Sequence, residues 1–210
     1  MLICLCLLCV ILGLLAWNTI SSTTMWSSFG APSHEPVTHE NMANAELTTL
    51  AFGVLENIKN GDFESLAEIA HPNFGVVFSP SATISLSTNR RFSAEQISQF
   101  ATDNNVYVWG LNNGSGEPID MTPVDYFAQF VYSGDFLNAS VIGINRIVRS
   151  GNALENLTNE FPGIKFVDFH IPGDEGDSSD DLDWSSLRIG FEEYGDSLWL
   201  VVIVHSTWTV

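Results

Sequence analysis

The chain has 210 residues, 45% of them hydrophobic, and a formal net charge of −18 at neutral pH. A field of this sign repels nucleic-acid phosphates and anionic membrane surfaces, so the composition argues against both as partners. The apolar content favours a packed domain over a disordered chain. A cationic partner, a divalent metal or a saline environment would suit the charge; alternatively, the acidic residues serve solubility alone.

An uncharged apolar run extends from Leu2 to Trp17 and contains all the cysteines, Cys4, Cys6 and Cys9. Such a run at an N-terminus is typical of the core of a signal peptide and is slightly short for a membrane span. A buried helix of a soluble domain is the alternative. We expect residues 1–20 to be a signal peptide or membrane anchor, which predicts a secreted or cell-envelope protein. Leucines precede Cys9 where a lipid-attachment cysteine usually follows a small residue, so lipidation has little support.

Residues 21–40 are polar, rich in serine and without a period, which is typical of a disordered tether. Residues 41–210 follow as a single domain of ordinary size that lacks cysteine, which excludes a disulfide scaffold. Its first element is a helix, because apolar residues recur at helical spacing from Ala45 to Ile58 and the pattern stops at Asn60-Gly61. Asp62 is expected to cap a short second helix.

Short strands and short helices alternate through the middle of the domain. We expect strands at residues 75–78, 106–109 and 141–148. Ser93 begins a helix with Gln96 in the capping-box position, and Thr122-Pro123 opens another that runs to Phe130. A further short helix is expected over residues 153–160.

The C-terminal third carries the clearest pattern. Residues 164–171 alternate as a strand, and residues 187–194 and 197–210 form a long hairpin over Gly195-Asp196. Helices come first and long antiparallel strands last. This order predicts an α+β fold in which a curved antiparallel sheet wraps around the N-terminal helix.

Several segments of the domain carry a recognisable pattern: His71-Pro72-x-x-Gly75-Val76-x-Phe78-Ser79-Pro80, Trp109-Gly110 followed by Gly114-Ser115-Gly116-Glu117-Pro118-Ile119, Asp183-Trp184-x-Ser186-Leu187-Arg188, and His205-x-x-Trp208-Thr209. The pattern resembles an uncharacterised family of exported bacterial proteins, many of them lipoproteins, over nearly the whole domain. The resemblance implies the cystatin-like α+β cone of nuclear transport factor 2-like proteins. It implies no activity, because that cone hosts isomerases, dehydratases, binding modules and inert scaffolds.

The hairpin register predicts which side chains share a face. A two-residue turn places Tyr194 opposite Ser197 and therefore Arg188 opposite Ile203. Because residues two apart share a face, Arg188 and His205 are expected on the same side of the sheet.

On the preceding strand Asp168 and His170 share a face by the same rule. If the strands are in phase, Asp168, His170, Arg188 and His205 converge in one concavity. That set is a candidate acid–base pocket. The alternative is a solvated or structurally satisfied polar face.

Metal binding has one weak candidate. An acidic loop contains Asp174, Asp177, Asp180 and Asp181, and dense carboxylates on a loop can hold calcium. The spacing differs from that of an EF-hand, so a solvated loop is the alternative. The histidines lack zinc-ligand spacing, and His71 is expected to bond the backbone at a helix end. No cofactor is expected, since no phosphate-binding glycine loop or nucleophile elbow is present in the sequence.

These patterns leave three functions open. The first is a ligand- or protein-binding module of the cell envelope. The second is a small enzyme that uses an Asp/His pair for proton transfer or hydrolysis. The third is a structural or assembly module without a ligand. The partners under consideration are therefore a protein, a small molecule or a second copy of the chain, with a membrane reached only through the N-terminal segment.

Overall fold

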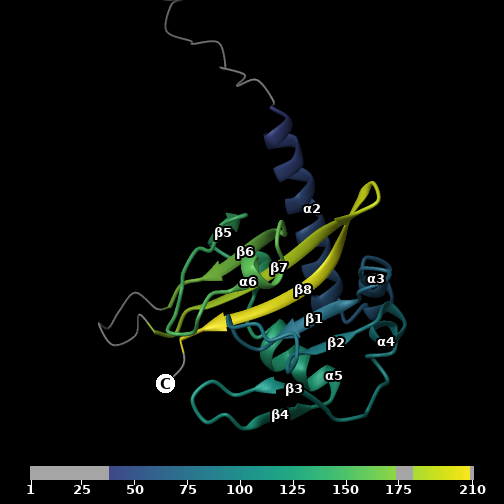
Figure 1. Cartoon of the computed structure of the whole chain (residues 1–210), viewed down its shortest axis with the longest axis vertical. Helices are drawn as coiled ribbons and strands as arrows, with labels where there is room; N and C mark the ends of the chain where they lie inside the picture. Colours follow the sequence, from purple (N-terminus) through teal and green to yellow (C-terminus); the bar gives the residue numbers. More distant parts are fainter. Residues whose placement is uncertain (1–37, 174–181, 209–210) are drawn as a thin grey trace, which may run out of the picture. The chain divides into compact units, whose positions relative to one another are not determined.

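Figure 1 shows a computed structural model of the chain, which describes residues 38–173 and 182–208. Residues 39–210 form a compact unit, which contains the hydrophobic core. The unit begins with the long helix α2 (His39–Asn60), so the helix starts inside the segment that the sequence predicts as tether. Among the described residues, no helix has both the length and the apolar character needed to cross a membrane.

A curved, open sheet of six strands follows, in the order β2-β1-β8-β7-β6-β5 (Figure 1). Its strands are β1 (Val76–Ser79), β2 (Arg90–Phe92), β5 (Val141–Ile144), β6 (Lys165–Ile171), β7 (Ser185–Tyr194) and β8 (Ser197–Thr207). A separate two-stranded sheet consists of β3 (Tyr107–Leu111) and β4 (Pro118–Met121). The α+β class predicted from the sequence is confirmed. The predicted sheet was antiparallel throughout, whereas β1 and β8 pair in parallel.

Helix α2 and several short helices cover one face of the sheet, which we call the inner face. These helices are α3 (Phe63–Glu68), α4 (Ala94–Ser98), α5 (Pro123–Tyr126), the π-helical turn η1 (Phe127–Val131) and the 3₁₀ turn η2 (Phe136–Asn138). Leu55 and Phe78 are fully buried here, and the Trp109 and Tyr126 rings stack with centroids 3.8 Å apart. Each large apolar side chain buried in this way contributes about 2 kcal/mol. The inner face is the main core, because it holds the larger of the two apolar clusters.

The capping signals in the sequence are confirmed. The Asp62 side chain accepts a hydrogen bond from the Ser65 backbone N–H at the start of α3. Ser93 and Gln96 form the expected capping box of α4. Thr122 caps α5 through the backbone N–H of Asp125. These interactions are local, which is why the sequence alone predicts them.

The opposite, outer face of the sheet is covered by residues 145–164, which we call the strap. In Figure 1 the strap helix α6 (Leu157–Glu160) lies in front of the sheet and α2 passes behind it. Leu157, Phe161 and Ile164 of the strap pack on a second apolar cluster that includes Val202 and Val204 of β8. The side chain of Asn156 accepts a hydrogen bond from the Ile84 N–H and donates one to the Ile84 carbonyl, which ties the strap to the loop after β1.

Strand β5 ends at Ile144, four residues before the predicted end at Val148. Asn145 turns the chain with φ 51°, a left-handed conformation that asparagine tolerates better than most residues. Its side-chain oxygen accepts a hydrogen bond from the Phe166 N–H, and its backbone N–H donates to the Phe166 carbonyl. The predicted helix over residues 153–160 shortens to α6, and strand β2 was not predicted.

Candidate functional site

The hairpin register differs from the predicted one beyond its tip. Tyr194 lies opposite Ser197, as predicted, but a bulge follows, because Phe191 pairs with Leu200 and Gly190 pairs with Val202. Val201 is the extra residue, and it shifts every later pair by one position.

The shift separates two of the predicted pocket residues. Arg188 lies opposite Val204 instead of Ile203, and His205 lies opposite Leu187. Because Leu187 belongs to the inner core, His205 is on the inner face, whereas Arg188 is on the outer face. The prediction that His205 and Arg188 share a face was wrong, and its cause is the bulge, which the turn type does not reveal.

Arg188 and Asp168 form a buried ion pair on the outer face. The Arg188 Nε donates to Asp168 Oδ2 at 3.2 Å, and both side chains are essentially inaccessible. The other end of the guanidinium holds both oxygens of Glu155 in the strap, at 2.6 and 3.0 Å, and the Arg149 carbonyl at 3.0 Å. The Val148 backbone N–H donates to the same Asp168 oxygen at 2.8 Å. These groups fasten the strap to the sheet.

Burial changes the proton affinity of the neighbouring groups. Burial raises the pKa of Glu155, although the positive charge of Arg188 acts in the opposite direction. His170 lies on the same face as Asp168, with its Nδ1 2.9 Å from Ser186 Oγ and its ring 5.7 Å from that of Trp184. Burial lowers the pKa of His170, while Asp168 partly opposes this shift. His170 is 5% exposed and therefore sits inside the packed layer under the strap.

His205 borders a separate small cavity on the inner side. Its Nε2 is 3.3 Å from Ser133 Oγ, and its ring packs edge-on against Phe130. Burial lowers its pKa to about 4, and the backbone carbonyl of Pro80 opposes this shift only partly. Among the residues that the structure describes, the cavity of about 90 Å³ has polar and apolar lining but no carboxylate side chain.

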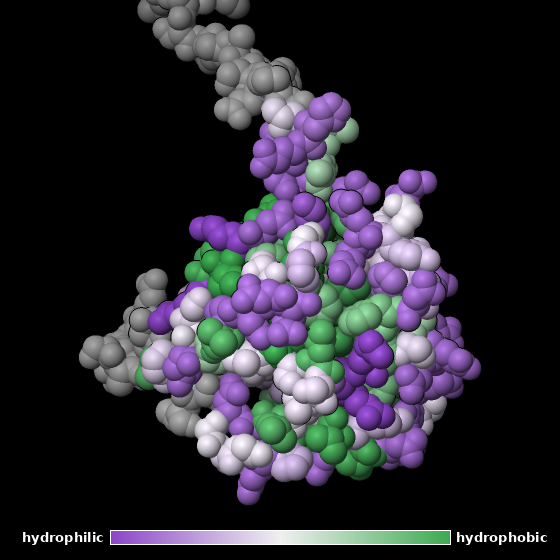
Figure 2. Space-filling model, in the orientation of Figure 1, coloured by the Kyte–Doolittle hydropathy of each residue, from purple (hydrophilic) through white to green (hydrophobic). Residues whose placement is uncertain are grey.

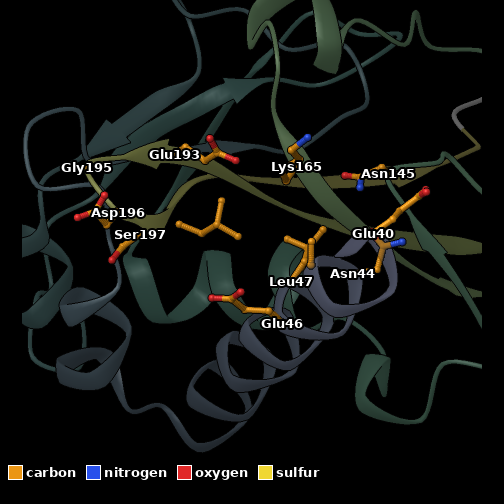
Figure 3. Close-up of a pocket in the computed structure, with 12 residues that line it drawn as sticks. Glu40, Asn44, Glu46, Leu47, Asn145, Lys165, Glu193, Gly195, Asp196 and Ser197 are labelled. Atoms are coloured by element: carbon orange, nitrogen blue, oxygen red, sulfur yellow. The ribbon is translucent and has the colours of Figure 1, made fainter. Parts of the chain in front are cut away.

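A larger cleft of about 470 Å³ lies between the start of α2 and the tip of the β7–β8 hairpin (Figure 3). Helix α2 contributes Glu46 and Leu47 on one side, and the strands contribute Lys165 and Glu193 on the other. Its volume falls within the range of ligand sites in proteins. We call this feature the acidic cleft.

The acidic cleft combines an apolar floor with a charged rim. Leu47 is buried and Leu198 half-buried, and both line the cleft. The carboxylates of the rim are all exposed: Glu40, Glu46, Glu193 and Asp196. Of the described side chains that line the cleft, Lys165 alone is positively charged. The cleft therefore presents a negative potential above a hydrophobic base, which suits a cationic ligand with an aliphatic stem.

Sequence reasoning missed the acidic cleft because its walls come from distant segments. The lining residues come together only in the folded unit, and they are residues 40–47, Asn145, Lys165 and residues 193–198. The one local signal was Gly195-Asp196, which marked the hairpin tip; Gly195 has φ 64°. Nothing in a single strand or helix indicated that the tip faces α2.

The sequence predictions on metal binding concern the calcium loop and the histidines. The calcium-loop residues Asp174, Asp177, Asp180 and Asp181 lie outside the described residues. Within residues 38–173 and 182–208, no group of three or more His, Cys, Asp or Glu side chains is arranged to hold a metal ion. His71 behaves as predicted, since its Nδ1 accepts hydrogen bonds from the backbone N–H groups of Asn73 and Phe74.

The comparison with solved structures gives a match of low similarity. A crystal structure described as a putative calcium/calmodulin dependent protein kinase II association domain from Xanthomonas campestris aligns with a TM-score of 0.33 and 15% sequence identity. The alignment covers 82% of this chain and 90% of that chain. No family model and no curated protein matches the chain. The resemblance to an exported bacterial family therefore stays a prediction.

Proposed function

We propose that the folded unit is a binding module whose acidic cleft takes a cationic segment of a partner protein, one that presents lysine or arginine. The observation that carries this proposal is the acidic cleft itself, with exposed carboxylates around an apolar floor. Lysine and arginine bury their methylene stems on apolar surface and keep the charged head in water. The half-buried Leu198 offers such a surface, and Glu46, Glu193 and Asp196 lie around it for the head group.

The strength of such binding follows from the exposure of the rim. Each exposed ion pair contributes about 0.2–1 kcal/mol and is screened by salt. Several pairs acting together with apolar contact give an affinity suited to reversible capture. The net charge of −18 adds long-range attraction for a basic partner.

The test uses residues 39–210 and a fluorescent tetralysine peptide, followed by anisotropy at low and physiological salt. The double variant Glu193→Gln/Asp196→Asn should weaken binding about tenfold, because two rim charges are lost. The matched control Glu64→Gln/Glu95→Gln removes the same charge from exposed positions outside the cleft. Equal weakening by both doubles would mean that the peptide senses only net charge, and the cleft proposal would be rejected.

We further propose that this module works outside the cytoplasm, secreted or tethered at the cell envelope through residues 1–20. The uncharged apolar run Leu2–Trp17 and the polar segment after it support the proposal. Expression of the full chain followed by N-terminal sequencing of the exported product tests it. A product that starts at Met1 and stays in the cytoplasm would contradict it.

The finer fold assignment, a cone of the nuclear transport factor 2-like type, is also a proposal. The open sheet that curves over α2 supports it. The enzyme hypothesis has less support than the binding module, because Asp168 and Arg188 bond each other beneath the strap and His205 lies on the other face. A purely structural role would leave the acidic cleft without a ligand, so the peptide experiment also distinguishes that hypothesis.

A further inference from the structure

Strand β5 ends the six-stranded sheet at one side, and within residues 38–173 and 182–208 it pairs with β6 alone. The outer edge of such a strand presents backbone N–H and C=O groups that a further strand can use. Val141 and Ile144 of this strand are 39% and 37% exposed. Figure 2 shows hydrophobic residues at the surface where Figure 1 places β5.

The segment around β5 carries no charge. Residues 136–145 read FLNASVIGIN, without any Asp, Glu, Lys or Arg, in a chain whose net charge is −18. Two copies of this chain repel each other through their net negative charge, and β5 adds no charge of its own to that repulsion. A basic partner would gain nothing here from charge, whereas a second copy meets an uncharged, apolar strand like its own.

The edge strand at the other end of the sheet, β2, has features that protect it from pairing with another molecule. Strand β2 is three residues long and contains Arg90 and Arg91. Arg90 lies over the rings of Phe92 and Tyr107, and Arg91 lies over Phe74. Short length and charged side chains are the usual devices that stop edge strands from pairing with another molecule. Strand β5 is also short, at four residues, but it has no charged side chain.

We propose that two copies of the folded unit associate through their β5 edges, in antiparallel pairing about a two-fold axis. A two-fold axis makes the interface isologous, so the same strand supplies both sides. Val141 and Ile144 of each copy then lie at the joint, and the two sheets continue into one another. This inference is independent of the acidic cleft and of its ligand.

Sedimentation velocity over a wide concentration range tests the proposal on residues 39–210. The wild-type unit should form dimers, and Val141→Lys should weaken dimerisation at least tenfold, because it places a charge at the joint. Val124→Lys is the matched control: Val124 is 49% exposed and lies on α5, so its dimerisation should equal that of the wild type. Thermal unfolding of the three proteins shows whether each is folded.

Hydrogen exchange adds a readout that a general loss of solubility would not produce. The backbone amides of β5 should exchange more slowly as the concentration rises, whereas those of β2 should not. A wild-type unit that stays monomeric at millimolar concentration would overturn the proposal. So would dimers that Val141→Lys leaves intact, or dimers that Val141→Lys and Val124→Lys weaken equally.

Discussion

Arg188 connects residues that are far apart in the sequence, and its contacts explain why the strap stays on the sheet. Its guanidinium bonds Asp168 on the neighbouring strand and Glu155 in the strap. Replacing Arg188 by Met should cost about 3–5 kcal/mol of unfolding free energy, because Asp168 then stays buried without its countercharge. Urea unfolding measures the loss.

Two further variants make this prediction specific. The double variant Arg188→Met/Asp168→Leu should be more stable than Arg188→Met alone, since the fully buried Asp168 carboxylate is no longer left without a countercharge. Glu155→Gln should cost less than Arg188→Met, because Glu155 keeps 16% exposure of its side chain. An Arg188→Met protein as stable as the wild type would show that the ion pair does not hold the strap.

His205 makes stability depend on pH in a predictable direction. Burial lowers its pKa in the folded state from 6.5 to about 4. Between these values the unfolded chain binds more protons than the folded one, so acid favours unfolding. The contribution of His205 to the free energy of unfolding is about 3 kcal/mol. It is fully present above pH 6.5 and is lost as the pH falls through about 4.

A comparison of variants isolates this group from its neighbours. The shift at His170 has the same direction, so the wild-type curve alone does not identify the residue. His205→Gln keeps a polar partner for Ser133 but does not titrate. Its unfolding free energy should fall less than that of the wild type between pH 6.5 and pH 4. Parallel pH curves for both proteins would show that His205 does not titrate on unfolding.

Replacing two glycines by alanine, one in β5 and one in α2, should change the stability of the unit in opposite directions. In β5, a Cβ on Gly143 would lie 2.1 Å from the Arg146 carbonyl oxygen and 2.9 Å from a Val148 methyl. In α2, a Cβ on Gly53 meets nothing within 4 Å. Gly143→Ala should therefore destabilise the unit by about 1–3 kcal/mol through overpacking. Gly53→Ala should stabilise it by about 0.5–1 kcal/mol, because alanine favours the helix.

Thermal unfolding of both variants measures these effects. A Gly143→Ala protein with wild-type stability would mean that the strap does not pack closely on β5. A loss of stability in Gly53→Ala would mean that something contacts this face of α2.

The elements differ in how far the sequence predicts them. Caps such as Asp62 and Ser93 depend on residues three or four positions away, so local chemistry predicts them. The hairpin turn at Gly195-Asp196 is local in the same way. The bulge at Val201 depends on packing across both faces of the sheet, and the parallel pairing of β1 with β8 depends on the whole chain path. Neither has a local signal.

The same reasoning explains the outcome for the candidate site. Asp168, His170 and Arg188 do share a face, because period-two alternation within strands and the β6–β7 pairing hold there. Whether that face is open to solvent depends on the strap. The sequence predicted a strand as far as Val148, which would have left no strap segment at residues 145–148. With Asn145 turning the chain, the strap covers these residues instead.

At the scale of the whole molecule, the dependence on salt distinguishes the two proposed contacts. Binding of a cationic segment in the acidic cleft should weaken as salt rises, because screening reduces its ion pairs. Dimerisation at the uncharged β5 edge should strengthen as salt rises, because screening reduces repulsion between two copies that each carry −18 in the full sequence. Anisotropy and sedimentation at matched salt concentrations measure both trends, and equal trends would mean that one contact is misassigned.

The central claim is that the acidic cleft binds a cationic segment, and a ¹⁵N–¹H NMR titration of residues 39–210 with tetralysine tests it most directly. The account predicts that the largest shifts occur at the amides around the cleft, such as those of Leu47, Lys165 and Ser197. It also predicts that these shifts fade in the Glu193→Gln/Asp196→Asn variant. Shifts spread evenly over the acidic surface, or absent from the cleft, would contradict the account.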